Sequence, residues 1–154
     1  MPRSRISDPA DDSWPPVWGV PLEGIPQALI IAQIRKEFVE QVMTLDDNNL
    51  DVVLTRKSRA HYLWKHPEMS TCERLLPRVL QAPSEVYRVF ADPRQVIFVR
   101  RILGHRYLMA GVLLDPTGRE KKHSVLTYYR LNPRTYRQLR NKGEVIWPLQ
   151  PKGN

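Results

Sequence analysis

A pair of histidines stands in the segment of this chain best suited to chemistry. His61 and His66 are five residues apart, among basic and aromatic residues at the end of a helical pattern. Imidazole titrates near neutral pH, so either side chain could act as a general acid or base. Five residues correspond to about 140° around a helix, so the two share a face only if the helix unwinds first, which Pro67 favours at His66. The alternative is that His66 simply interacts with the carbonyls and dipole of a helix C-terminus.

A second candidate segment begins at His123 and continues with the hydroxyls of Ser124 and Thr127. In a regular strand the two hydroxyls point to opposite faces, because successive side chains alternate. A bulge, or the use of a backbone group, would be needed to bring both to one site. The alternative is that these residues only reflect strand propensity.

Adjacent arginines supply fixed positive charge. Arg100 and Arg101 occupy one strand pattern, so one faces the helix-covered side of the sheet or its margin and the other faces water or substrate. A planar guanidinium can hold two oxygens of one phosphate. We count Lys122, His123 and Arg130 as further candidate substrate-binding residues, although a solvated charged face would explain such a rim equally well.

The sequence gives little support for a metal or a cofactor. Cys72 is the single cysteine, so no intrachain disulfide and no cysteine-based zinc site can form. A zinc site built from His61, His66 and His123 is conceivable, but the spacing matches no established zinc motif. We therefore expect neither a metal nor a cofactor.

The charge balance points to a polyanionic partner. The 154 residues carry a formal net charge of +8, which favours nucleic acid or an anionic surface. The N-terminus has no apolar core of a signal peptide, and no apolar run is long enough for a membrane span. We expect a cytoplasmic protein with no membrane partner; export by a specialised system would leave no mark here.

Periodicity predicts the elements that must position these residues. Residues 1–24 read as an extended arm rich in Pro and Trp. Residues 25–49 read as an N-terminal helix and turn, with apolar residues at helical intervals over 27–43. The candidate catalytic residues fall in the remaining unit, residues 50–150.

Within residues 50–150 the pattern changes from helical to strand-like. A strand over 50–55 precedes a helix capped at Ser58 and a second helix bent at Pro77. Further strands are predicted over 85–90, 96–103, 107–114, 124–131 and 145–147, with a short helix over 133–141. Helices followed by an antiparallel meander indicate an α+β fold with one face of the sheet covered.

Three of these motifs together resemble a known group of proteins. They are the histidine string followed by Pro-Glu over 61–68, the helix that ends in Ala-Pro-Ser-Glu-Val over 82–86, and the Ser-Val-Leu-Thr strand over 124–127. In these motifs, over roughly residues 50–147, the chain resembles the phage-associated nuclease-like domains of the barnase–EndoU–colicin E5/D–RelE superfamily. One departure is His123, where members of that group often carry a small polar residue.

The resemblance implies N-terminal helices packed on a four-stranded antiparallel sheet, as in ribonuclease toxins, with the active site on its concave face. It also implies metal-independent cleavage of RNA, in which the 2′-hydroxyl attacks the adjacent phosphate to leave a 2′,3′-cyclic phosphate. The roles it implies are proton transfer by His61 and then His66, charge stabilisation by Arg100 or Arg101, and phosphate binding by Ser124 and Thr127.

The expected function is therefore a toxin- or effector-like endoribonuclease that acts on RNA. A cognate antitoxin or immunity protein would be its second partner. The alternative is a catalytically inert nucleic-acid-binding or phage-associated accessory protein with the same fold. A nucleotide-handling enzyme fits less well, because the sequence holds no Gly-rich phosphate loop.

Overall fold

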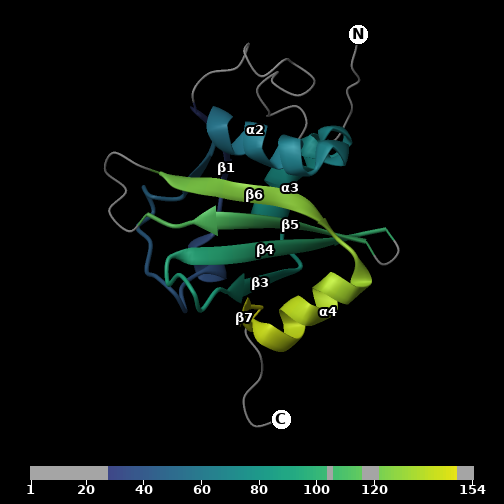
Figure 1. The fold of residues 1–154 in the computed structure, drawn as a ribbon. Coiled ribbons are helices and arrows are strands. Elements are labelled where there is room, and N and C mark those ends of the chain that lie inside the picture. The colour runs from purple at the N-terminus through teal and green to yellow at the C-terminus, as the bar shows by residue number, and fades with distance from the viewer. Residues whose placement is uncertain (1–27, 104–105, 116–121, 149–154) are drawn as a thin grey trace.

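The computed structural model describes residues 28–103, 106–115 and 122–148 of the chain, and the arm predicted over 1–24 lies outside them. Seven strands form one sheet, and three α-helices and three short 3-10 helices accompany it in the described residues (Figure 1). The strands are β1 (Ala28–Gln33), β2 (Asp51–Thr55), β3 (Glu85–Arg88), β4 (Gln95–Ile102), β5 (Arg106–Leu113), β6 (His123–Leu131) and β7 (Glu144–Trp147). The helices are η2 (Lys36–Phe38), α2 (Arg56–Lys65), η3 (Pro67–Thr71), η4 (Glu73–Leu75), α3 (Leu76–Gln81) and α4 (Pro133–Lys142).

The strand order across the sheet is β1-β2-β6-β5-β4-β3-β7. All neighbours are antiparallel except β2 and β6, which run parallel. The α+β class is confirmed, whereas the four-stranded sheet is wrong. The extra strands lie at both edges of the sheet. β2 and then β1 follow β6 at one edge, and β7 lies beside β3 at the other.

The N-terminal part of the prediction is also wrong. Residues 27–43 were expected to form a helix, but β1 occupies Ala28–Gln33 and only the short η2 follows. β1 pairs antiparallel with β2, so its backbone groups are satisfied in the sheet ladder. Adjacent β-branched Ile30 and Ile31 favour this pairing. Ile34 and Phe38, two of the apolar residues at the predicted helical intervals, are buried, but Ile34 follows β1 and Phe38 belongs to η2.

The histidine-bearing helix begins and ends at recognisable signals. The N-cap of α2 is Thr55 and not Ser58 as expected: the Thr55 hydroxyl accepts a hydrogen bond from the Ser58 backbone N–H at 3.0 Å. The helix ends at its C-cap residue His66, directly before Pro67, as the sequence predicted. Pro77 lies in the first turn of α3, so it begins that helix rather than bending it.

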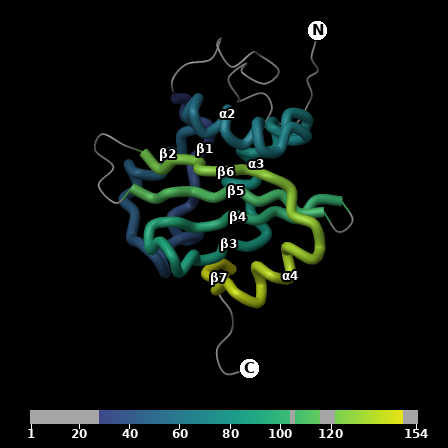
Figure 2. The backbone as a smooth tube through the Cα atoms, in the orientation of Figure 1, coloured from purple at the N-terminus to yellow at the C-terminus, as the bar shows by residue number. Residues whose placement is uncertain are grey.

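One face of the sheet carries the main core. Paired residues on neighbouring strands point to the same side, and the row of Val86, Phe98, Ala110 and Tyr128 is fully buried. α3 lies behind this face in the ribbon view, and α2 lies along the β6 side of the sheet (Figure 1). The tube view shows the same arrangement, with the strands stacked between α2 and α4 (Figure 2). We call this side the covered face.

The opposite side of the sheet, which we call the open face, is covered only in part. α4 packs there through Tyr136 and Leu139 against a small cluster of Tyr87, Val99 and Met109. α4 begins at the N-cap Asn132, whose side-chain oxygen accepts from the Thr135 backbone N–H at 2.8 Å, a capping interaction. α4 occupies one end of this face, and no other described helix lies over the sheet surface between α4 and α2 (Figure 1).

A buried ion pair ties α2 to the segment that follows it. Arg59 and Glu73 are 3% and 2% exposed, and the guanidinium donates from Nε and one terminal nitrogen to the two carboxylate oxygens at 2.7 Å. The Tyr62 hydroxyl donates to the same carboxylate. The hydrogen bonds to the Glu73 carboxylate raise the pKa of Arg59, so its guanidinium stays charged. Tyr62 also packs edge-on against Tyr128 of β6, with ring centroids 5.7 Å apart.

Removing one partner of this pair should destabilise the fold strongly. We expect Glu73→Gln to lower the free energy of unfolding by about 3–5 kcal/mol, because the Arg59 charge would stay buried without its carboxylate. Chemical denaturation would measure the change. The control is Glu68→Gln, at a 51% exposed carboxylate 3.8 Å from His66, which should cost less than about 1 kcal/mol. Equal effects of the two substitutions would contradict the structural role of the pair.

Candidate functional site

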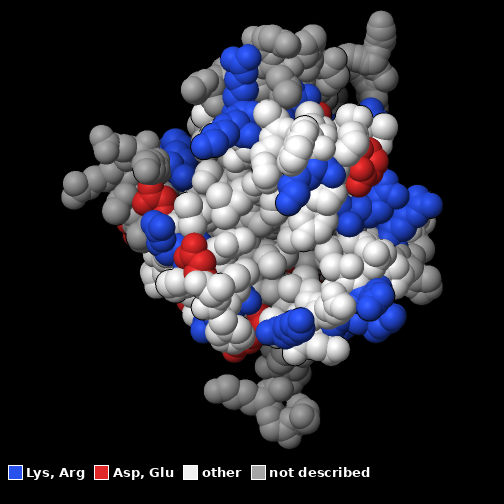
Figure 3. Space-filling view, in the orientation of Figure 1, with Lys and Arg blue, Asp and Glu red and all other residues white. Residues whose placement is uncertain are grey.

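The open face holds a shallow, uncharged hollow surrounded by positive charge. The space-filling view shows white atoms set back over the middle strands, with Lys and Arg side chains around them and fewer Asp and Glu (Figure 3). The register places seven residues of β6, β5 and β4 on this side of the sheet, partly buried except for the buried glycine: Ser124, Thr127, Tyr129, Gly111, Leu113, Gln95 and Ile97. We call these residues the floor.

A β-bulge brings the two hydroxyls to the same face. Thr127 pairs with Gly111, but Val125 pairs with Val112, so β6 contains one extra residue at this point. Ser124 therefore pairs with Leu113 on the same side as Thr127, whereas Val125 is buried on the covered face. The bulge that the sequence analysis required for a shared site is present.

His66 lies over the same strand. Its ring stacks on the ring of Tyr129, with centroids 4.7 Å apart and an angle of 17° between the planes. Tyr129 belongs to the floor and follows Thr127 by two residues, about 6.6 Å along the strand. The side chain of His66 is one-third exposed, and its Nδ1 lies 3.8 Å from a carboxylate oxygen of Glu68. The imidazole thus lies at one side of the hollow with two hydroxyls further along β6.

Gly111 leaves the centre of the floor without a side chain. A Cβ added there would come within 3.1 Å of the Thr127 methyl group and 3.5 Å of the Gln95 amide nitrogen. A side chain at this position would therefore crowd Thr127. An isolated glycine inside a strand pattern is typical of a bulge or of close approach by another group. This glycine was the one signal in the sequence that could have located the floor.

The structure places the first predicted histidine elsewhere. His61 is exposed on α2, whereas Arg59 and Tyr62 of the same helix are buried. It therefore lies on the solvent side of α2, and only His66 is brought to the hollow. No direct contact joins the two histidines among the hydrogen bonds and ring contacts of the described residues.

Arg100 and Arg101 lie on opposite faces of the sheet, as their adjacent positions in one strand predicted. Arg100 pairs with buried Leu108 on the covered face, and its guanidinium donates to the backbone carbonyl of Ala82, the C-cap residue of α3. Arg101 is exposed and pairs with Tyr107 on the side that carries α4. Of the two, Arg101 is the one on the open face.

The remaining predicted binding residues do not reach the floor. The Lys122 Nζ lies 3.2 Å from a carboxylate oxygen of Asp51, the first residue of β2. Arg130 is exposed but shares its side of the sheet with Leu108, opposite to the floor. These placements count against direct contact between either residue and a substrate held in the hollow.

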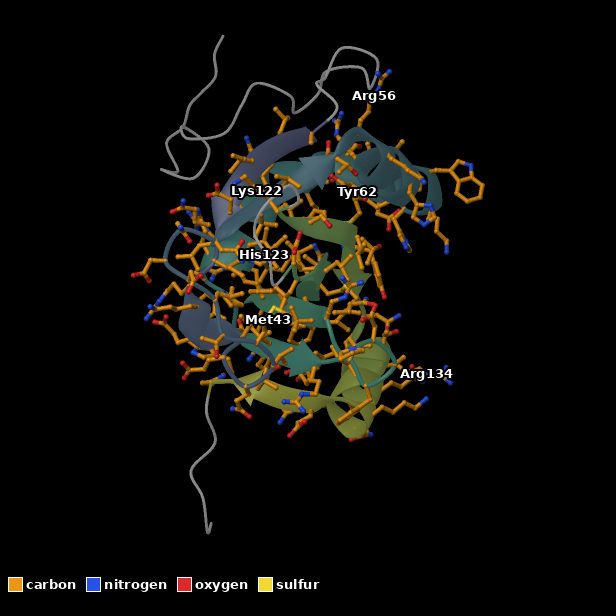
Figure 4. The ribbon with its side chains drawn as sticks, turned by 90° about the vertical axis from the view of Figure 1, so that its left-hand side faces the viewer. Met43, Arg56, Tyr62, Lys122, His123 and Arg134 are labelled. Carbon is orange, nitrogen blue, oxygen red and sulfur yellow. The ribbon has the colours of Figure 1, made fainter. Side chains whose placement is uncertain are left out.

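His123 has a structural role. It is fully buried, its Nδ1 accepts from the Asp115 backbone N–H at 2.9 Å, and its Nε2 donates to the Asn49 carbonyl at 2.8 Å. Both ring nitrogens are therefore hydrogen-bonded to backbone groups. The ring joins two loops to the beginning of β6. Burial lowers the pKa of His123, which keeps the ring neutral. His123 is thus part of the interior, as the labelled stick view also shows (Figure 4).

One polar cluster beside the hollow escaped the sequence analysis. The Glu85 carboxylate accepts from the hydroxyls of Tyr87 at 2.8 Å and Tyr136 at 2.6 Å, and Arg140 lies 3.9 Å from its other oxygen. Burial and this carboxylate raise the pKa of both tyrosines. The cluster fixes α4 to β3. Two elements about 50 residues apart in the sequence, β3 and α4, supply these residues, so no local pattern connects them.

The two helices that border the hollow are rich in cations. α4 carries exposed Arg134 and Arg137, and α2 carries exposed Lys57 and Lys65. Neither helix contains Asp or Glu. Arg134 projects from the outer side of α4 in the stick view, while Arg56 lies at the far end, at the start of α2 (Figure 4). A polyanion on the open face would thus meet positive charge on both sides.

A scan against models of protein families, a search of curated proteins and a search of solved structures each found no match. In residues 28–103, 106–115 and 122–148, no group of three or more His, Cys, Asp and Glu side chains is placed to hold a metal ion. Over the same ranges no helix has the length and apolarity needed to cross a membrane.

The buried neutral His123 predicts a pH-dependent stability. Its folded pKa lies below the ordinary value of about 6.5, so its contribution is complete above that pH and is lost as the pH falls below it. The free energy of unfolding, measured by denaturant titration between pH 7.5 and 5, should fall more steeply for the wild type than for His123→Gln. His61→Gln, at an exposed position, should keep the wild-type slope. Equal slopes for the wild type and His123→Gln would contradict this assignment.

Proposed function

We propose that this protein is a metal-independent endoribonuclease that binds RNA across the open face. The observation that carries the proposal is the placement of His66, Ser124 and Thr127 on one uncharged hollow bordered by cationic helices. A proton-transfer group, two hydroxyl donors and a basic surround are the parts that phosphodiester cleavage without a metal requires.

In the proposed reaction His66 is the general base. It accepts the proton of the ribose 2′-hydroxyl while the 2′ oxygen attacks the neighbouring phosphorus. The bond from phosphorus to the 5′ oxygen breaks, and that oxygen takes a proton from water or from the protonated imidazole. Ser124 and Thr127 donate hydrogen bonds to the phosphate oxygens, where negative charge accumulates. The products are a 2′,3′-cyclic phosphate and a free 5′-hydroxyl.

This assignment gives the proton-transfer role to His66 rather than to His61. The support is geometric, since His66 stacks on a floor residue and His61 faces solvent. Tyr129 has a positioning role, because its ring fixes the plane of the imidazole. The charge clamp would fall to Arg101, the member of the arginine pair on the open face.

The proposal extends to partners and location. RNA is the substrate, and a protein that neutralises the activity would have to cover the hollow and meet the cations of α2 and α4. Such an antitoxin or immunity protein would present acidic groups, because charge complementarity favours association. Action on RNA fits a protein that works in the cytoplasm.

A second candidate is an RNA-binding accessory protein without turnover. The observation that favours it is that His66 is the one imidazole that the described residues place at the hollow. The same basic surround would bind RNA with a steep salt dependence and yield no product.

The decisive substitution is His66→Gln. If His66 is the general base, we expect the cleavage rate of total RNA or a tRNA pool, assayed with excess EDTA, to fall by about 10²–10⁴-fold. The ends formed by the wild type should be cyclic phosphates. Gel analysis with end-group mapping measures both.

Two controls separate catalysis from folding and from the other histidine. Thermal unfolding of His66→Gln should match the wild type, since the ring is partly exposed and forms no buried hydrogen bond through its side chain. His61→Gln should lose far less activity than His66→Gln. A larger loss in His61→Gln would overturn the assignment, and intact RNA with the wild type at every concentration would favour the binding protein.

A further inference from the structure

We infer that Trp64, with Lys57 and Lys65, forms a stacking platform for an unpaired base of the RNA beside the hollow. This inference rests on the proposed function and adds to it, because it names the form of substrate bound: single-stranded RNA that extends past the cleavage site. The platform lies outside the floor and uses residues that the reaction does not.

The indole of Trp64 is presented to solvent. It is 79% exposed, although it is the largest apolar side chain on α2 and the buried side of that helix holds Arg59 and Tyr62. Tryptophan is usually well buried when it serves packing. A flat ring exposed on the outside of a rigid helix offers a π-face on which any base can stack.

The charges around Trp64 suit a nucleic-acid backbone. Lys57 and Trp64 are seven residues apart, so they lie close to one face of the helix, and Lys65 follows Trp64 directly. Both lysines are exposed. With no Asp or Glu in α2, no carboxylate of the helix itself competes for these cations. Aromatic rings interleaved with cations are the usual composition of surfaces that bind single strands.

The platform lies at the same end of α2 as the proposed base, but on the solvent side of the helix. Trp64 precedes the C-cap residue His66 by two residues, about 3 Å along the helix axis and about 200° around it. The Arg59–Glu73 pair fixes α2, so Trp64 and the hollow keep a fixed relation. A strand whose phosphate lies at Ser124 and Thr127 would therefore pass His66 and turn around the C-terminal end of α2 to reach Trp64.

A membrane surface would also meet a tryptophan between lysines, but the geometry favours RNA. An interfacial helix needs a broad apolar face. On α2 the other outward residues are polar or small, and Trp64 is the one exposed large apolar side chain of this helix. A single indole ring is enough to stack on one base, whereas it would bury little apolar area in a lipid interface.

The test measures binding without turnover. The probe is a labelled 12-nucleotide single strand with 2′-O-methyl riboses, which lack the attacking hydroxyl, and fluorescence anisotropy gives its Kd. We expect Trp64→Ala to weaken binding by about tenfold, on the order of one stacked base, and Trp64→Phe to retain most of the affinity. Lys57→Ala and Lys65→Ala should each lower the slope of log Kd against log salt by about 0.7.

The matched control is Phe90→Ala, which removes another exposed aromatic ring, 67% exposed in the turn after β3. Its affinity should equal that of the wild type. Equal Kd values for the wild type and Trp64→Ala would overturn the platform, as would a loss of binding in Phe90→Ala as large as in Trp64→Ala. Vesicles with an anionic lipid serve as a third probe, and Trp64-dependent binding to them with unchanged RNA binding would also overturn it.

The failure of the platform and the failure of the proposed function give different results. If the wild type binds and cleaves RNA but Trp64→Ala binds equally well, only the platform is wrong. If the wild type binds neither the 12-nucleotide strand nor total RNA, the proposed function is wrong and the platform falls with it.

Discussion

The buried pair of Arg59 and Glu73 is the constraint on which the histidine segment depends. Two hydrogen bonds at 2.7 Å between these buried side chains hold α2 to η4. A buried pair of this kind gains little stability over an apolar one but permits few alternative arrangements, because either charge alone would be costly. Tyr62 joins the pair to β6, so the end of α2 is set against the sheet at one angle. His66 meets Tyr129 as a consequence.

The sheet makes a site possible by having two different faces. The covered face holds the main core with α3, and the open face gains only α4 at one end. The bulge in β6 then changes which residues appear on the open face, since one extra residue shifts Ser124 to the side of Thr127. Without that shift, one hydroxyl would point into the core. A local irregularity in one strand thus assembles the two hydroxyls.

Sequence reasoning succeeded where local preference and final environment agree. β4, β5 and β6 are rich in β-branched and aromatic residues, and the helix end at His66 is forced by Pro67, so these elements were predicted closely. It failed over residues 27–43, where a short apolar run fits both a helix and a buried strand. The partner of β1 decides that question, and β2 lies about 20 residues further along the chain. Pairing between distant segments carries no local signal.

Three of the four histidines, those considered as site residues, show the same difference between local pattern and tertiary placement. The sequence alone determined that the chain is basic, that it forms an α+β fold, and that imidazoles and hydroxyls occur in two segments. It could not rank His61, His66 and His123, because residue type is the same in all three. Tertiary packing decided their environments: His61 faces solvent, His123 bonds to two backbone groups, and His66 stacks beside the hollow. The physical reason is that burial and hydrogen-bond partners come from segments far apart in sequence, whereas spacing fixes only neighbours on the same element.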